Sequence, residues 1–231
     1  SIAYSAAIAI SLAQSAINGA SFPAFAHSFS KNETAELLTR YGKASELMGF
    51  VVALPCFALV FFGHEILELW INSKVAAATA PAMALLAIGF FFNAMVSSAY
   101  IAAIACGRPI LPLWVNLLAL LVYLPALYGL IEGFGILGAA FAYAGLNFYY
   151  VFTLLPLVQI KVLRQKTVAW LTANLFPAAA VGFCTMGVMK AAALAVGSGW
   201  FGWTALSFGV VLYGIISLKI MSAGLRSDLL G

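Results

Sequence analysis

Long apolar runs separated by short polar connections dominate the chain. Seven runs are bounded by charged residues, Gly or Pro. Each is near or above the roughly 20 residues that an α-helix needs to cross the hydrocarbon core of a bilayer. They cover residues 2–27, 47–67, 76–105, 110–131, 134–160, 168–193 and 199–222. The pattern predicts an all-α integral membrane protein, a polytopic bundle of about seven transmembrane helices.

The connection between the first two runs follows a different pattern. Six of the 11 basic and 7 acidic residues lie between residues 31 and 46. Apolar residues recur there at helical spacing while the charges take the other face, which predicts an amphipathic helix over 30–46 on the membrane surface. Ser30 and Glu33 have the spacing of a capping box, in which each side chain binds a free backbone N–H. We expect this helix to begin there.

Composition supports a membrane protein and excludes several other classes. Of the 231 residues, 65% are hydrophobic and 8% are charged, whereas a soluble domain is about 45–50% apolar and about 25% charged. The net charge of +4 comes without a Lys/Arg run, so we expect no nucleic-acid partner. Cys56, Cys106 and Cys184 form no CxxC pair, and the two His lie near opposite membrane faces. We therefore expect no metal site, disulfide framework or cofactor.

Basic residues predict the orientation of the helices. With seven spans, nine of the 11 basic residues fall in connections on one side or at the C-terminus, and only Lys74 and Lys190 on the other. Because cytoplasmic loops carry an excess of Lys and Arg, the first side should be cytoplasmic. Ser1 would then lie outside, so we expect at least one preceding span. The nine are Lys31, Arg40, Lys43, Arg108, Lys161, Arg164, Lys166, Lys219 and Arg226.

The first run carries a polar stripe. Its members recur three or four residues apart on one helix face. They could bind neighbouring helices, or they could line a water-filled cavity. Five polar residues exceed what packing needs, which favours the cavity, and amides suit sugar hydroxyls because they both donate and accept hydrogen bonds. The stripe consists of Ser11, Gln14, Ser15, Asn18 and Ser21.

Other polar residues within the spans are isolated. For Asn93, Asn116 and Asn147 an interhelical hydrogen bond is the favoured explanation, and Asn116 is also a candidate for the cavity. Lys190 should extend to the outer interface. No Asp or Glu falls near the middle of a predicted span, so this chain by itself offers no site for proton or cation coupling.

Short motifs spread along the whole chain resemble one transporter superfamily. In chain order the motifs are FPAF (22–25), a span with a central Pro55, HEILELW (64–70), ACGRP (105–109), a span that contains Asn116, and GFGILGAAFAYA (133–144). In this order they resemble the multidrug/oligosaccharidyl-lipid/polysaccharide exporter superfamily, especially its Wzx-type polysaccharide flippases. The last two runs are similar to the extra C-terminal helix pair of polysaccharide and lipid II flippases.

The resemblance implies an architecture and an activity. Residues 1–160 would form five helices of the C-terminal lobe of a two-lobed transporter like the multidrug and toxin extruders, and 161–231 two additional helices. The N-terminal lobe would be another part of the same protein. The substrate class would be an undecaprenyl-pyrophosphate-linked oligosaccharide, such as an O-antigen unit, carried across the bacterial inner membrane by alternating access. Membrane lipid and the polysaccharide polymerase machinery would be partners, and the C-terminus would be cytoplasmic.

The resemblance also suggests roles for individual residues. The run 2–27 corresponds in order to a cavity-lining helix, which agrees with its polar stripe. Arg40, Lys43 and Arg108 would lie at the cytoplasmic mouth, where basic side chains can bind a pyrophosphate. No residue is expected to be catalytic, since flipping makes and breaks no covalent bond.

Two other functions remain open. A drug/cation antiporter of the same superfamily would need a buried carboxylate, which another lobe could supply. A membrane-embedded glycan-processing enzyme would need acid and base residues in outer loops or a cavity. The outer connections carry only His64, Glu65, Glu68 and Glu132 as candidates, so we prefer the flippase.

Overall fold

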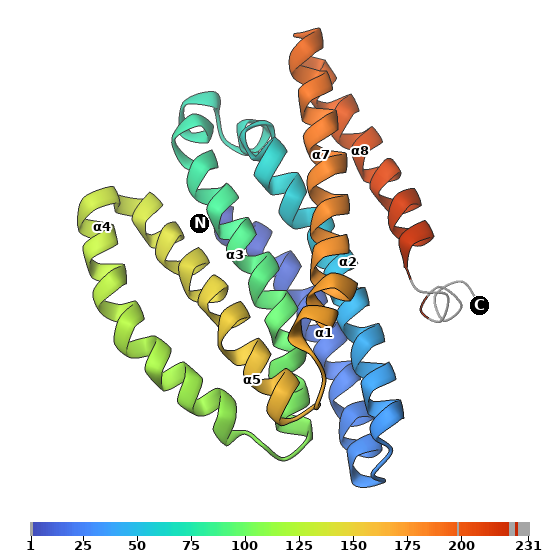
Figure 1. Cartoon of the computed structure of the whole chain (residues 1–231). Helices are drawn as coiled ribbons and strands as arrows, with labels where there is room; N and C mark the ends of the chain where they lie inside the picture. The colour runs from blue at the N-terminus through green and yellow to red at the C-terminus, as the bar shows by residue number, and fades with distance from the viewer. Residues whose placement is uncertain (1, 198, 222–224, 226–231) are drawn as a thin grey trace.

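A computed structural model describes residues 2–197, 199–221 and 225, and in these residues the chain is helical without β-strands. Arg226 and the end of the predicted segment 161–231 lie outside the described residues. The helices are α1 (Ile2–Ser30), α2 (Thr34–Trp70), α3 (Ser73–Ala105), α4 (Ile110–Phe152), α5 (Leu154–Lys161), α6 (Thr167–Trp170), a π-helix η1 (Leu171–Leu175), α7 (Phe176–Val196) and α8 (Gly199–Ile220) (Figure 1).

Successive connections lie at alternate ends of the bundle. The connections 31–33, 106–109 and 162–166 lie at the lower end in Figure 1, and residues 71–72 at the other. The element α4 is itself a hairpin, because Gly135 has non-helical dihedral angles (φ 58°, ψ −131°). Its first arm corresponds to the apolar run 110–131, and its second arm together with α5 corresponds to the run 134–160. The lower end is the one that the basic residues predict to be cytoplasmic.

Five helices in the described part of the chain are long and apolar enough to cross a membrane. One of them, Ile110–Lys161, has 52 residues and contains the turn at Gly135. Although α1 has 29 residues, it is not among the five, and its Ser, Gln and Asn residues lower its hydropathy. The protein is therefore a multi-pass helical membrane protein. The count of seven spans and the division at residue 160 stay predictions.

The helix α2 forms the centre of the bundle and packs against α1, α3, α7 and α8. Tyr41, Met48 and Val52 on this helix are fully buried. Small residues allow α2 and α7 to approach closely, because a Cβ added to Gly49 would lie 3.0 Å from the Cβ of Ala178 on α7. The first arm of α4, in contrast, exposes a broad apolar surface, which a bilayer would cover.

The amphipathic segment is not a separate helix. It forms the first turns of α2, which runs without interruption from Thr34 towards the membrane. The predicted capping box is wrong. Ser30 is the last residue of α1 and donates to the carbonyl of His27 (2.8 Å), and Glu33 makes no side-chain cap. Asn32 takes a left-handed conformation (φ 59°), and the backbone N–H of Glu33 donates to the carbonyl of Ser28 (2.9 Å). Backbone bonds thus close the turn without the box.

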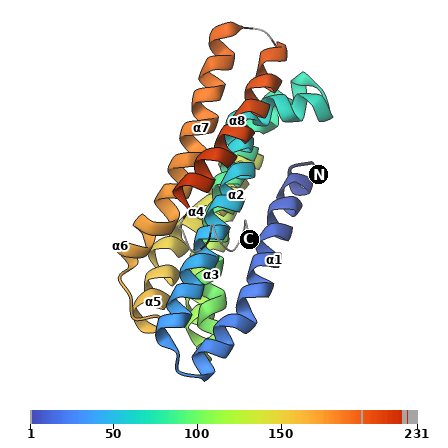
Figure 2. The same ribbon diagram turned by 90° about the vertical axis from the view of Figure 1, so that its right-hand side faces the viewer.

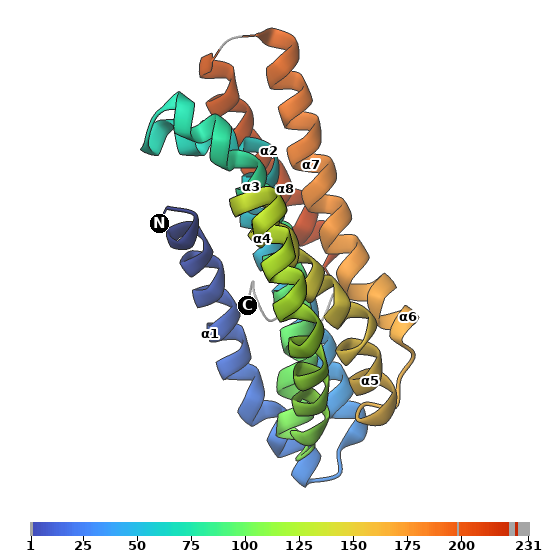
Figure 3. The same cartoon turned by 90° about the vertical axis from the view of Figure 1, so that its left-hand side faces the viewer.

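The upper part of α2 bends at Phe62, whose dihedral angles leave the helical range (φ −115°, ψ 15°). Gly63 follows it, and a Cβ there would lie 2.8 Å from Met83 Cε of α3. Beyond the bend, the connection between α2 and α3 projects sideways towards the N-terminal end of α1 (Figures 2 and 3). Tertiary packing therefore gives this end of the bundle its asymmetric shape.

Candidate functional site

A chain of three side-chain amides joins α1, α3 and α4. Gln14 Nε2 donates to Asn93 Oδ1 (3.1 Å), and Asn93 Nδ2 donates to Asn147 Oδ1 (2.8 Å). Asn147 Nδ2 in turn donates to the carbonyl of Tyr143 (2.9 Å). Asn147 is 1% exposed, so water cannot easily replace this last link. Asn93 and Asn147 make the interhelical bond expected of them.

A second polar contact lies one turn further along α1. Asn18 Nδ2 donates to Ser97 Oγ (3.0 Å), whose own hydroxyl donates to the carbonyl of Ala94 (2.7 Å). Ser21 Oγ donates to the carbonyl of Ile17 within its own helix (2.7 Å). The two amides of the stripe therefore face α3, and both are only half-buried.

The neighbouring face of α1 is open. Ser15, Ala16 and Gly19 are exposed, and Ser11 is half-buried. This face carries a hydroxyl and small residues, and it borders the edge at which Gln14 and Asn18 meet α3. Hydrogen bonds within the bundle account for the two amides in this conformation. That the stripe lines a cavity stays a prediction.

The structure does not bring Asn116 to the stripe. It lies on the first arm of α4, whereas α1 packs against α2 and α3. Its side chain is exposed between apolar neighbours such as Val115 and Leu117. Sequence order alone could not show this, because it does not say which face of a span points to the bundle.

The three basic candidates lie at the lower end of the bundle and have different surroundings. Arg40 forms an ion pair with Glu36 one turn before it, and its Nε donates to the same carboxylate oxygen (2.9 Å). Arg108 Nη1 donates to the backbone carbonyl of Lys161 at the end of α5 (2.8 Å). Lys43 is half-buried on α2. The charge of Arg40 is thus already balanced, whereas the partner of Arg108 among the described residues is a neutral carbonyl.

An ion pair near the upper end was missed from the sequence. Lys190 Nζ on α7 binds Glu65 Oε1 on α2, and the two side chains are 21% and 22% exposed. The same ammonium group lies 5.3 Å from the ring centroid of Phe62, where α2 bends. The side chain of Lys190 therefore ends in an ion pair, and its extension to the outer interface stays a prediction. Opposite charges near the same predicted ends of two spans were the signal for this pair.

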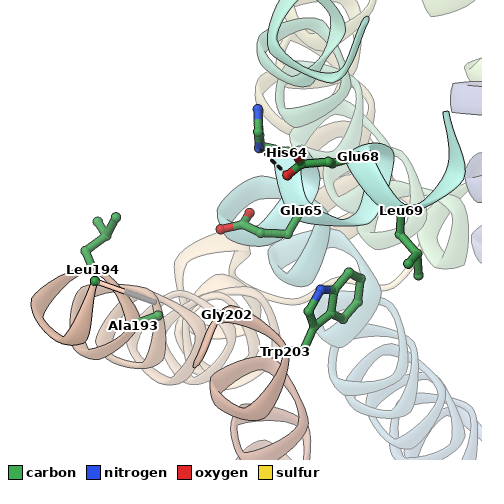
Figure 4. A pocket seen from close by; sticks show the side chains of 9 residues that line it. His64, Glu65, Glu68, Leu69, Ala193, Leu194, Gly202 and Trp203 are labelled. Atoms are coloured by element: carbon green, nitrogen blue, oxygen red, sulfur yellow. Dashed lines mark ion pairs between the residues drawn. The ribbon is translucent and has the colours of Figure 1, made fainter. Parts of the chain in front are cut away.

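A cavity of about 490 Å³ lies beside this ion pair, between α2 and the α7–α8 hairpin (Figure 4). His64 Nδ1 lies 3.8 Å from Glu68 Oε2 on its wall, and Trp203 of α8 forms part of the lining. In the described part of the chain, no three His, Cys, Asp or Glu residues are grouped to hold a metal ion. Charged side chains line this cavity, but His64 and Glu68 are 42% and 49% exposed, so water screens them.

Comparison with known proteins gives one distant similarity. The chain is 29% identical over 101 residues to the "Putative O-antigen transporter" of Shigella flexneri. The matched stretch covers 43% of this chain and only 24% of that protein. No protein-family model matches the chain. No solved structure matches it. The similarity points to a polysaccharide transporter and leaves substrate and mechanism open.

Proposed function

We propose that the protein is a flippase that carries an undecaprenyl-pyrophosphate-linked oligosaccharide, such as an O-antigen unit, across the bacterial inner membrane by alternating access. The observation that carries the proposal is the polar edge between α1 and α3, where Gln14 and Asn18 meet amide and hydroxyl partners inside an otherwise apolar bundle. The distant similarity to an O-antigen transporter supports the same class of cargo.

The bonds at this edge can be exchanged for bonds to a sugar. An amide both donates and accepts, and so does a glycan hydroxyl. If α1 moves away from α3, the side chains of Gln14 and Asn18 can therefore bind the glycan and lose no hydrogen bond. Ser11 and Ser15 would extend the same surface along α1. The opposite wall of the cavity would come from the N-terminal lobe of the same protein.

The pyrophosphate would first meet the lower end of the bundle. Arg108 and Lys43 are the main candidates there, because the ion pair with Glu36 already neutralises Arg40. Charge-assisted bonds to phosphate oxygens are about twice as strong as neutral ones. The polyprenyl tail would stay in the bilayer, and the transport step would make and break no covalent bond.

Substitution at the polar edge tests the role of α1 in the full-length protein. We expect Gln14→Ala/Asn18→Ala, expressed in a strain lacking the native gene, to export at least about tenfold less glycan at an unchanged protein level, because two amide contacts of about 1 kcal/mol each are lost. The matched control is Thr204→Ala/Ser207→Ala on α8. These two exposed hydroxyls donate only to carbonyls of their own helix. Wild-type export by the α1 variant would refute the assigned surface.

A further inference from the structure

A second cavity, of about 410 Å³, opens between the second arm of α4 and the start of α7, with α2 and α3 behind it. Every residue that lines it is apolar, and it contains six phenylalanines: Phe57, Phe91, Phe92, Phe148, Phe152 and Phe176. Three of these are half or more exposed: Phe148 (50%), Phe152 (62%) and Phe176 (55%). The cavity, here called the phenylalanine groove, is thus open at its rim.

The shape of the groove follows from the connection below it. In Figure 1 the second arm of α4 and the helix α7 lie close together near α5 and α6 and diverge upwards. Ring contacts stiffen the α4 side, where Phe148 lies 5.7 Å from Phe92 and 4.8 Å from Phe152. On the other side, the π-helix η1 contributes Leu171 and Leu175 to the wall. A π-helical turn inside an α-helix often marks a functional position.

A hydrocarbon chain suits the interior of this groove. Water does not fill an apolar cavity that offers it no hydrogen-bond partners. A loop or strand of another protein would leave its backbone N–H and C=O groups unpaired, which costs several kcal/mol per group in hydrocarbon. A hydrocarbon chain has neither difficulty. Because the rings at the rim are exposed, such a chain can enter the groove from the bilayer.

The lower end of the groove is strongly basic. Three exposed cations lie on the chain there: Lys161 at the end of α5, and Arg164 and Lys166 in the connection that follows it. The bond from Arg108 to the carbonyl of Lys161 holds the connection before α4 against the end of α5. The sequence has no acidic residue between positions 133 and 227. Lys166 precedes Leu171 in the groove wall by five residues, which is about 7 Å along a helix. A lipid whose anionic headgroup binds at this rim can therefore place an acyl chain in the groove.

We propose that the phenylalanine groove and its basic rim bind an anionic phospholipid of the inner leaflet, with one acyl chain among the phenylalanines and the phosphate against Arg164 and Lys166. Basic pockets between transmembrane helices on the cytoplasmic side are typical headgroup sites. A lipid-linked glycan shares this chemistry, but α1 and its polar edge lie on the other side of the bundle from α6 (Figure 2). We therefore assign the groove to a resident lipid, and competition with undecaprenyl phosphate distinguishes this lipid from the cargo.

The test measures lipid binding to the purified full-length protein, by native mass spectrometry during titration with phosphatidylglycerol or phosphatidylcholine. We expect tight binding of phosphatidylglycerol only. Arg164→Gln/Lys166→Gln should weaken it roughly 25-fold, since each cation near an anionic lipid contributes about fivefold. The control Lys31→Ala/Lys74→Ala removes the same net charge from exposed sites away from the groove and should bind like wild type.

A variant that fills the groove distinguishes lipid binding within the groove from lipid binding to the basic surface alone. Ala179→Phe places a ring in the groove and should reduce binding while leaving the basic rim intact. Binding that survives Ala179→Phe, or that falls equally in both charge variants, would overturn the proposal. Displacement of phosphatidylglycerol by equimolar undecaprenyl phosphate would overturn it as well, because the site would then belong to the cargo. None of these readouts involves transport, so failure here leaves the proposed flippase untouched.

Discussion

Glu65 and Lys190 show how single residues connect the C-terminal helices to the rest of the bundle. Their ion pair lies between α2 and α7, mostly shielded from solvent. The second carboxylate oxygen of Glu65 is buried and has no hydrogen-bond partner among the described residues. Because Lys190 also lies over the ring of Phe62, the pair is placed to hold the bend of α2. Its loss would affect a contact between elements and not only a surface charge.

A charge exchange tests this pair. Glu65→Gln and Lys190→Met should each destabilise the full-length protein by about 1–3 kcal/mol, because each leaves a partly buried charge without its partner. The exchange Glu65→Lys/Lys190→Glu restores the attraction and should recover at least half of the loss. Thermal unfolding in detergent measures both effects. If the exchanged protein is as unstable as the sum of the single variants, the pair does not act as described.

At the scale of elements, the α4 hairpin shows what the sequence could and could not predict. The apolar runs 110–131 and 134–160 locate its two arms, because each run must cross hydrocarbon with its backbone bonds satisfied internally. The gap between the two runs, at residues 132–133, predicts a turn, and the structure has it two residues later at Gly135. The bend of α2 at Phe62 could not be predicted, because the residues that lie against it, Lys190 and Met83, are distant in sequence. Likewise, the capping box fails because backbone bonds around Asn32 satisfy the same groups.

Gly138 lies next to the turn of the α4 hairpin, where there is no space for a side chain. A Cβ on Gly138 would lie 1.9 Å from the carbonyl oxygen of Leu130, which is backbone and cannot move aside cheaply. Gly138→Ala should therefore open the hairpin and lower the yield of folded protein several-fold. Gly129→Ala is the matched control, because no atom lies within 4 Å of the added Cβ. That variant should be neutral or slightly more stable. Size-exclusion profiles of the two variants check the prediction, and identical profiles would contradict it.

For the whole molecule, the structure has two distinct surfaces, and the sequence indicated only one of them. The polar stripe was visible because polar residues are rare in a membrane span. The packing of α1 decides which members of the stripe bind α3. The packing of α4 places Asn116 away from the stripe. The phenylalanine groove had no sequence signal, because its residues come from distant apolar runs that look alike. The molecule thus has a polar edge on α1 and an apolar groove beside α7, suited to a glycan and to a lipid chain respectively.

The most direct measurement is to delete the full-length gene in its own host and to assay the lipid-linked glycan on each side of the inner membrane. We expect that complete glycan-lipid accumulates in the cytoplasmic leaflet while surface polysaccharide is lost, and that the wild-type gene restores export. Unchanged surface glycan, together with raised sensitivity to cationic dyes, would contradict it and indicate a drug/cation antiporter instead.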